Sequence, residues 1–195
     1  MYCLQFFSFN VIVMVKDFLI KEITMSKIKT NLLQLLSFLP ALLLLYMIFG
    51  FSSQDAETSG SLSFEISLFI VRLFSPLLPV TTNEDIFMQR AEMIHIFVRK
   101  AAHMTEYFLL ALSLQLPLYS YLRQKIYLKK RIIIGFLFTV LIAIADEFYQ
   151  TTIPGRSGNI IDVCIDSTGA LIAMFFLISL SYIKNHKINN NNSTI

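Results

Sequence analysis

The sequence predicts an all-α integral membrane protein, a four-helix bundle with both termini in the cytoplasm and an amphipathic interfacial helix in the first external loop. Of its 195 residues, 55% are hydrophobic and only 15% are charged, which is typical of polytopic membrane proteins rather than soluble domains. Four apolar stretches are long enough to span a bilayer. Basic residues collect in the segments between and beside these stretches, and their distribution predicts the orientation.

The four predicted spans are residues 32–51, 101–122, 132–152 and 160–183. The first carries no charge, and the others carry theirs within the first or last turns. Basic residues precede the first span, separate the second from the third, and follow the fourth: Lys16, Lys21, Lys27, Lys29, Arg123, Lys125, Lys129, Lys130, Arg131, Lys184 and Lys187. These segments are therefore predicted to be cytoplasmic (N-in, C-in), and the acidic loop from 52 to 98 external.

An amphipathic helix is predicted within that external loop. One helical face carries Leu62, Ile66, Phe69, Ile70 and Leu73, and Ser75-Pro76 followed by Pro79 should end the helix. This pattern is typical of a helix lying in the membrane interface. The alternative is a lid that packs its apolar face on the bundle.

The chain outside the spans divides into three parts. Residues 1–24 are interpreted as a doubtful N-terminal extension, because Met25 with its Lys27 and Lys29 flank has the pattern of a start directly before a span. Residues 25–184 form the membrane domain, and the Asn-rich tail 185–195 is expected to be disordered. Cys3 and Cys164 indicate neither a disulfide framework nor a metal-binding pair.

Polar and charged residues gather at the external ends of the second, third and fourth spans. Ionisable groups inside a membrane are costly and mark a functional site by default. Glu106, Asp146 and Asp166 should each lie about 7 to 9 Å below the outer boundary, given a rise of 1.5 Å per residue. The predicted ligand-binding residues are Arg99, Lys100, His103, Glu106, Asp146, Glu147, Gln150, Arg156, Asp162 and Asp166.

Helical spacing supports convergence of these residues. Arg99, His103 and Glu106 share one face, as do Asp162 and Asp166. An arginine on the Pro154–Gly158 turn suits a carboxylate or a phosphate. The competing interpretation is a structural network of buried salt bridges, in which Asn159 and Asp162 serve the end of the fourth helix. His103 and Glu106 would then be a satisfied polar pair.

Several motifs together resemble the VanZ-like membrane proteins. They are Ser52-Ser53-Gln54, Arg99-Lys100-x-x-His103-x-x-Glu106-Tyr107, Asp146-Glu147-x-x-Gln150, and Pro154-Gly155-Arg156-Ser157-Gly158 leading to Asp162, Asp166 and Gly169. The resemblance covers about residues 32–183 and implies a multi-pass protein of the bacterial cytoplasmic membrane. It also implies a link to resistance against teicoplanin, a glycopeptide antibiotic that carries a lipid.

Three functions are open from the sequence. The first is a cell-envelope protein whose outer-leaflet site binds an anionic lipid-linked or cell-wall component and contributes to teicoplanin-type glycopeptide resistance. Arg99, Lys100 and Arg156 would contact the anion. The second is a membrane-embedded hydrolase or transferase acting on a lipid headgroup, with His103, Glu106, Asp146 and Asp166 as catalytic candidates. The third is a small proton-coupled transporter.

The expected partners are membrane lipid and a lipid-linked cell-wall precursor or a glycopeptide. Nucleic acid is not expected as a partner, and no cofactor or metal is expected. The oligomeric state does not follow from the sequence.

The orientation is tested by labelling introduced cysteines in intact cells. In a background with Cys3 and Cys164 replaced by serine, cysteines at positions 55 and 157 should react with a membrane-impermeant maleimide, because both lie in predicted external loops. A cysteine at position 124 should react only after the cells are opened. Labelling at position 124 alone in intact cells would reverse the topology.

Overall fold

The computed structural model describes residues 27–77, 83–122 and 125–192, and within these ranges it contains helices and no strand. Residues 27–36 are helical and lead into α2 (Leu39–Ser52). The other elements are α3 (Ala56–Phe74), the short 3-10 helix η1 (Ser75–Leu77), α4 (Glu84–Ser113), α5 (Gln115–Leu122), α6 (Leu128–Gln150) and α7 (Ile160–Asn192). The expected extension 1–24 lies outside the described residues.

Four helices are long and apolar enough to cross a membrane, which confirms the predicted all-α membrane class. They are Lys27–Ser52, Ala56–Leu77, Leu128–Gln150 and Ile160–Lys184. Three overlap predicted spans, but the predicted span 101–122 is divided between α4 and α5 at Leu114. Residues 101–113 are instead the second half of a 30-residue helix that begins at Glu84.

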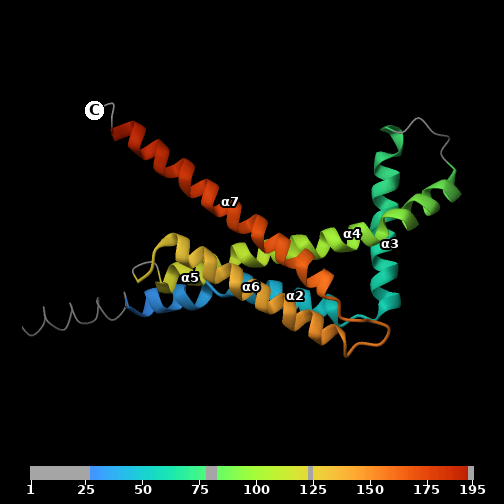
Figure 1. Ribbon diagram of the computed structural model, residues 1–195, viewed down its shortest axis with the longest axis horizontal. Coiled ribbons are helices and arrows are strands. Elements are labelled where there is room, and N and C mark those ends of the chain that lie inside the picture. The colour runs from blue at the N-terminus through green and yellow to red at the C-terminus, as the bar shows by residue number, and fades with distance from the viewer. Residues whose placement is uncertain (1–26, 78–82, 123–124, 193–195) are drawn as a thin grey trace, which may run out of the picture.

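The α3 helix runs across α4 rather than along the bundle (Figure 1). Asp55 caps it by accepting a hydrogen bond from the Thr58 N–H at 2.7 Å. Its buried residues are Ser63, Ser67 and Val71, and the serine hydroxyls bond carbonyl oxygens of their own helix. Small side chains with satisfied hydroxyls let α3 approach α4 closely.

Much of the apolar face predicted for this helix is exposed. Leu62, Ile66, Phe69 and Leu73 are 42 to 66% exposed. A lid would bury this face on the bundle, so its exposure favours the interfacial position over the lid. Length and hydropathy alone also allow α3 to span, but its direction across α4 argues against a parallel place in the bundle.

Small residues let the bundle helices pack closely. One buried cluster joins α2, α4, α6 and α7 through Ala41, Ile48, Tyr107, Leu110, Ala143 and Val163. A second joins α4 to α7 through Ala111, Ala170 and Ala173. At Gly169 the two backbones come so close that an added Cβ would overlap the carbonyl oxygen of Met104. The α4–α7 contact therefore depends on a glycine, as in many membrane bundles.

The last helix is longer than the sequence indicated. α7 continues past the predicted end at Ile183 to Asn192, so the structure differs from the expected disordered tail over 185–192. Figure 1 shows its C-terminal part projecting away from the other helices. No glycine or proline follows Gly169 in the sequence, so nothing local interrupts the helix.

The close approach at Gly169 is tested by Gly169→Ala. The added methyl group would push α4 from α7, and overpacking of this kind costs about 1 to 3 kcal/mol. The melting temperature in mild detergent should fall. Gly50→Ala is the matched control, because nothing lies within 4 Å of its added Cβ. Equal melting temperatures for the two variants would contradict the packing argument.

Candidate functional site

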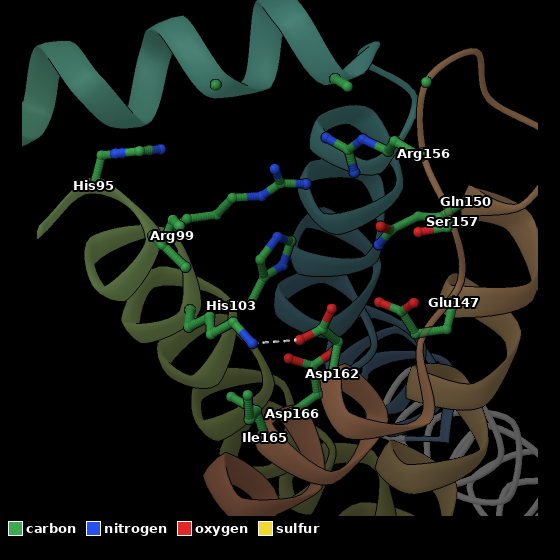
Figure 2. Close-up of a pocket in the computed structure, with 15 residues that line it drawn as sticks. His95, Arg99, His103, Glu147, Gln150, Arg156, Ser157, Asp162, Ile165 and Asp166 are labelled. Carbon is green, nitrogen blue, oxygen red and sulfur yellow. Dashed lines mark hydrogen bonds and ion pairs between the residues drawn. The ribbon is translucent and has the colours of Figure 1, made fainter. Parts of the chain in front are cut away.

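A cavity of about 360 Å³ lies where the middle of α4, the end of α6 and the start of α7 meet under α3 (Figure 2). Its volume is within the range of small-molecule sites, about 300 to 1,000 Å³. The α6–α7 connection closes one side. The cavity is lined by Ala56, Gly60, His95, Ile96, Arg99, Lys100, His103, Glu147, Gln150, Gly155, Arg156, Ser157, Asp162, Ile165 and Asp166.

Two arginines face this cavity from opposite sides. Arg99 extends from α4 and Arg156 from the α6–α7 connection (Figure 2). The Arg156 Nη2 donates to the Phe51 carbonyl oxygen at 3.3 Å, while its Nε and Nη1 are buried and have no hydrogen-bond partner among the described residues. Burial, with a smaller contribution from the nearby Arg99 charge, lowers the pKa of Arg156 below its ordinary value. In the described part of the chain, neither guanidinium has a carboxylate within ion-pair distance.

The turn that holds Arg156 depends on two glycines. Gly155 has φ 74°, in the left-handed region that glycine adopts without strain, and it packs against Ala56 at the start of α3. At Gly158 an added Cβ would lie 2.7 Å from the Glu147 carbonyl oxygen, so only glycine fits there. These glycines allow the turn to fold back over the end of α6.

Acidic residues form the opposite part of the cavity. Lys100 Nζ pairs with Asp162 Oδ1 at 2.9 Å, which links α4 to α7. Glu147 Oε2 accepts from the Asn159 N–H at 2.9 Å and so links α6 to the start of α7. Asp166 is only 2% exposed and lies near Asp162 (Figure 2). The site is therefore cationic beside α3 and acidic where α7 begins.

Asp146 lies outside the cavity wall, completely buried between α2 and α6. Its Oδ2 accepts from Ser52 Oγ at 2.8 Å and from Gln150 Nε2 at 3.1 Å, and Gln150 also donates to Ser52 Oγ at 3.2 Å. Tyr107 of α4 is buried beside this carboxylate. The arrangement joins three helices, so Asp146 has a structural place rather than direct access to a ligand in the cavity.

A second cavity of about 120 Å³ adjoins the first between α2, α3 and α4. Arg99 and His103 line both cavities. Glu106 lines only the second, where its Oε2 lies 3.4 Å from His103 Nδ1. The remaining lining residues are mostly apolar or small: Phe51, Gln54, Ser59, Leu62, Ser63, Ile66, Val98 and Ala102.

The structure thus brings most of the predicted site residues together. Eight of the ten line the larger cavity, Glu106 lines the smaller one, and Asp146 lies behind Gln150. Asn159 also caps α7 as proposed, since its Oδ1 accepts from the Ile161 N–H at 3.0 Å. Asp162 nevertheless has its own ion pair with Lys100, so it does more than serve the helix end.

Three positions were missed as site residues. His95 lies one turn before Arg99, and the i, i+4 spacing through His103 was the available signal. Ser52 and Tyr107 stood within the matching motifs, but nothing in their spacing indicated that they would lie beside Asp146. Among the residues that the structure describes, no group of three or more His, Cys, Asp or Glu side chains is arranged to hold a metal ion.

A protein-family model described as VanZ/LLP1 matches residues 37–182, which include every helix from α2 to α6 and most of α7. The chain belongs to the VanZ/LLP1 family. The match covers both cavities and the Asp146 network, and it confirms the resemblance drawn from the motifs. Neither the curated proteins nor the solved structures contain a match to the chain.

The Asp146 network is tested by Ser52→Ala. Loss of this donor leaves a buried carboxylate oxygen less satisfied, at a cost of about 1 to 3 kcal/mol, and the melting temperature in detergent should fall. Ser53→Ala is the control, because its exposed hydroxyl bonds only the Gly50 carbonyl oxygen of the preceding turn. If Ser53→Ala lowers the melting temperature as much as Ser52→Ala does, the hydrogen bond from Ser52 to Asp146 contributes nothing specific to stability.

Proposed function

We propose that this VanZ/LLP1 family protein binds the anionic headgroup of a lipid-linked or cell-wall component in the larger cavity, and so contributes to resistance against teicoplanin-type glycopeptides. The observation that carries the proposal is that Arg99 and Arg156 face one cavity and that neither has an ion-pair partner among the described residues. Two cations that lack a carboxylate within ion-pair distance in the described residues are stabilised by an anion between them.

Phosphate suits this pair better than a single carboxylate does. A guanidinium presents several N–H donors in one plane, and a phosphate group has enough oxygens to accept from both arginines. Arg156 contributes the buried Nε and Nη1 that otherwise lack acceptors. Bound phosphate would satisfy these donors and remove the repulsion between the two side chains.

The acidic part of the cavity supports a headgroup that also carries hydrogen-bond donors. Asp162 and Asp166 lie across from the arginines, and carboxylates accept from hydroxyl or ammonium groups. Lys100 neutralises part of this charge through its pair with Asp162. A phosphate bearing a sugar or an amine matches both parts of the site.

With the predicted N-in, C-in orientation, we expect the cavity in the outer leaflet of the cytoplasmic membrane. A protein that holds lipid-linked or cell-wall components there would alter the surface that a lipid-bearing glycopeptide approaches. This supports the resistance proposal through the family and the site together.

Headgroup binding is tested with the full chain in phosphatidylcholine nanodiscs, titrated with inorganic phosphate at low salt. Arg99→Ala and Arg156→Ala should each weaken binding about tenfold or more, since a hydrogen bond to a charged group contributes about 1.5 to 3 kcal/mol. Arg90→Ala is the control, because Arg90 is on α4 but lines neither cavity. The headgroup proposal fails if phosphate does not bind, or if Arg90→Ala weakens binding as much as the cavity variants.

The resistance proposal is tested in cells that express the same variants at equal membrane levels. Arg156→Ala should remove any protection against teicoplanin, whereas Arg90→Ala should retain it. Equal susceptibility with and without the unmodified protein would reject the resistance role while leaving headgroup binding to its own test.

A second candidate function is a membrane-embedded hydrolase or transferase. The observation that favours it is His103, which lines the cavity beside the arginines and has Nδ1 3.4 Å from Glu106 Oε2. These two atoms lie within ion-pair distance but make no hydrogen bond among the described residues, and a carboxylate this close would stabilise the imidazolium formed when His103 accepts a proton as general base. Release of inorganic phosphate from a bound lipid phosphate, lost in His103→Gln, would support this candidate over simple binding.

A further inference from the structure

The smaller cavity begins where the larger one ends. Arg99 and His103 form part of both walls, so a molecule held by Arg99 in the larger cavity has the smaller cavity directly beside it. The smaller cavity is partly open and lies between the end of α2, the first half of α3 and the middle of α4. The two spaces differ in chemistry, because one is rich in charge and the other is mostly apolar.

The walls of the smaller cavity present hydrocarbon. Phe51, Leu62, Ile66 and Val98 provide large apolar surfaces. Ser63 contributes no free hydroxyl donor, because its Oγ donates to the Ser59 and Gly60 carbonyl oxygens of α3 at 3.1 and 2.9 Å. Arg99 and His103 are shared with the larger cavity, and Glu106, which lines only the smaller one, is the remaining ionisable side chain among its described lining residues. Covering such a surface with apolar groups removes it from water and is therefore favourable.

The dimensions suit the beginning of one hydrocarbon chain. A single water needs about 10 to 15 Å³ of comparable space, so 120 Å³ holds several methylene groups but not the whole chain of a membrane lipid. The apolar residues Leu62 and Ile66 line the cavity and are also 42 and 44% exposed on the outer face of α3. A hydrocarbon chain that leaves the cavity over Leu62 and Ile66 would therefore remain in contact with apolar surface.

We propose that the ligand is a lipid phosphate whose phosphate lies between Arg99 and Arg156 and whose first several chain carbons occupy the smaller cavity between α3 and α4. The inference rests on the proposed headgroup function and specifies its substrate class. A free soluble phosphate uses only the larger cavity, whereas a lipid phosphate uses both. His103 and Arg99 then lie beside the junction of phosphate and chain.

The experiment compares inorganic phosphate with hexyl phosphate on the full chain in phosphatidylcholine nanodiscs, with binding to empty nanodiscs subtracted. A buried methylene tightens binding about fourfold at most, so even partial burial of six carbons should make hexyl phosphate at least tenfold tighter than inorganic phosphate. Equal affinities in the unmodified protein would overturn the inference and leave the headgroup proposal standing.

Ala102→Phe and the smaller change Ala102→Leu fill the second cavity from α4. Each should remove most of the gain from the hexyl chain and keep inorganic phosphate within twofold, and retained phosphate binding shows that the variant is folded. Ala101→Phe is the matched control, because Ala101 is exposed on the same helix and lines neither cavity. It should retain the gain.

The outcomes separate the two proposals. A hexyl gain that persists in both Ala102 variants overturns the chain inference, as does loss of phosphate binding in both, because the cavities then do not act separately. Arg156→Ala should weaken both probes. If neither probe binds the unmodified protein, the headgroup function itself fails.

Discussion

Asp146 is completely buried near the end of α6, so its carboxylate must find hydrogen-bond donors within the protein. Ser52 at the end of α2 and Gln150 one turn further along α6 supply them. A buried carboxylate that loses a donor is strongly destabilised, so these hydrogen bonds hold the ends of α2 and α6 together. The position of the α2–α3 connection, and with it the start of α3, follows from that pairing.

The neighbouring carboxylate fixes the other side of the same helix end. Glu147 accepts from the Asn159 N–H, so two adjacent acids connect α6 to α2 on one side and to α7 on the other. Asp162 pairs with Lys100. With these acids engaged in packing, Arg99 and Arg156 are left facing the cavity without a carboxylate partner in the described residues. The same pairing that stabilises the bundle therefore leaves the two arginines free of these acids, which is the basis of the proposed anion site.

The serine face of α3 explains why a second cavity adjoins the first. Ser63 and Ser67 pack on α4 with their hydroxyls bonded to their own helix, which leaves Leu62 and Ile66 at the edge of this contact, partly exposed. The helix then covers the arginines while its larger side chains border an apolar space. A single amphipathic helix thus borders both the charged cavity and the mostly apolar one, and the proposed preference for a lipid phosphate depends on this neighbouring position.

The sequence by itself determined the membrane class, the family and the set of charged residues that gather at one end of the bundle. Hydropathy and the cost of intramembrane charge are properties of short segments, so they can be predicted without coordinates. Only the tertiary structure decided which of these charged groups pair. The rotation of each helix about its axis and its distance from its neighbours depend on close contacts, such as that of Gly169 in α7 with the Met104 backbone in α4. Asp146 and Asp166 have similar sequence surroundings, yet packing places the first behind Gln150 and the second at the cavity. Hydropathy likewise could not predict which of the segments 56–77 and 101–122 runs along the bundle, because both are apolar enough. The contacts decide it: α4, which includes residues 101–113, packs along α7, whereas α3 packs across α4.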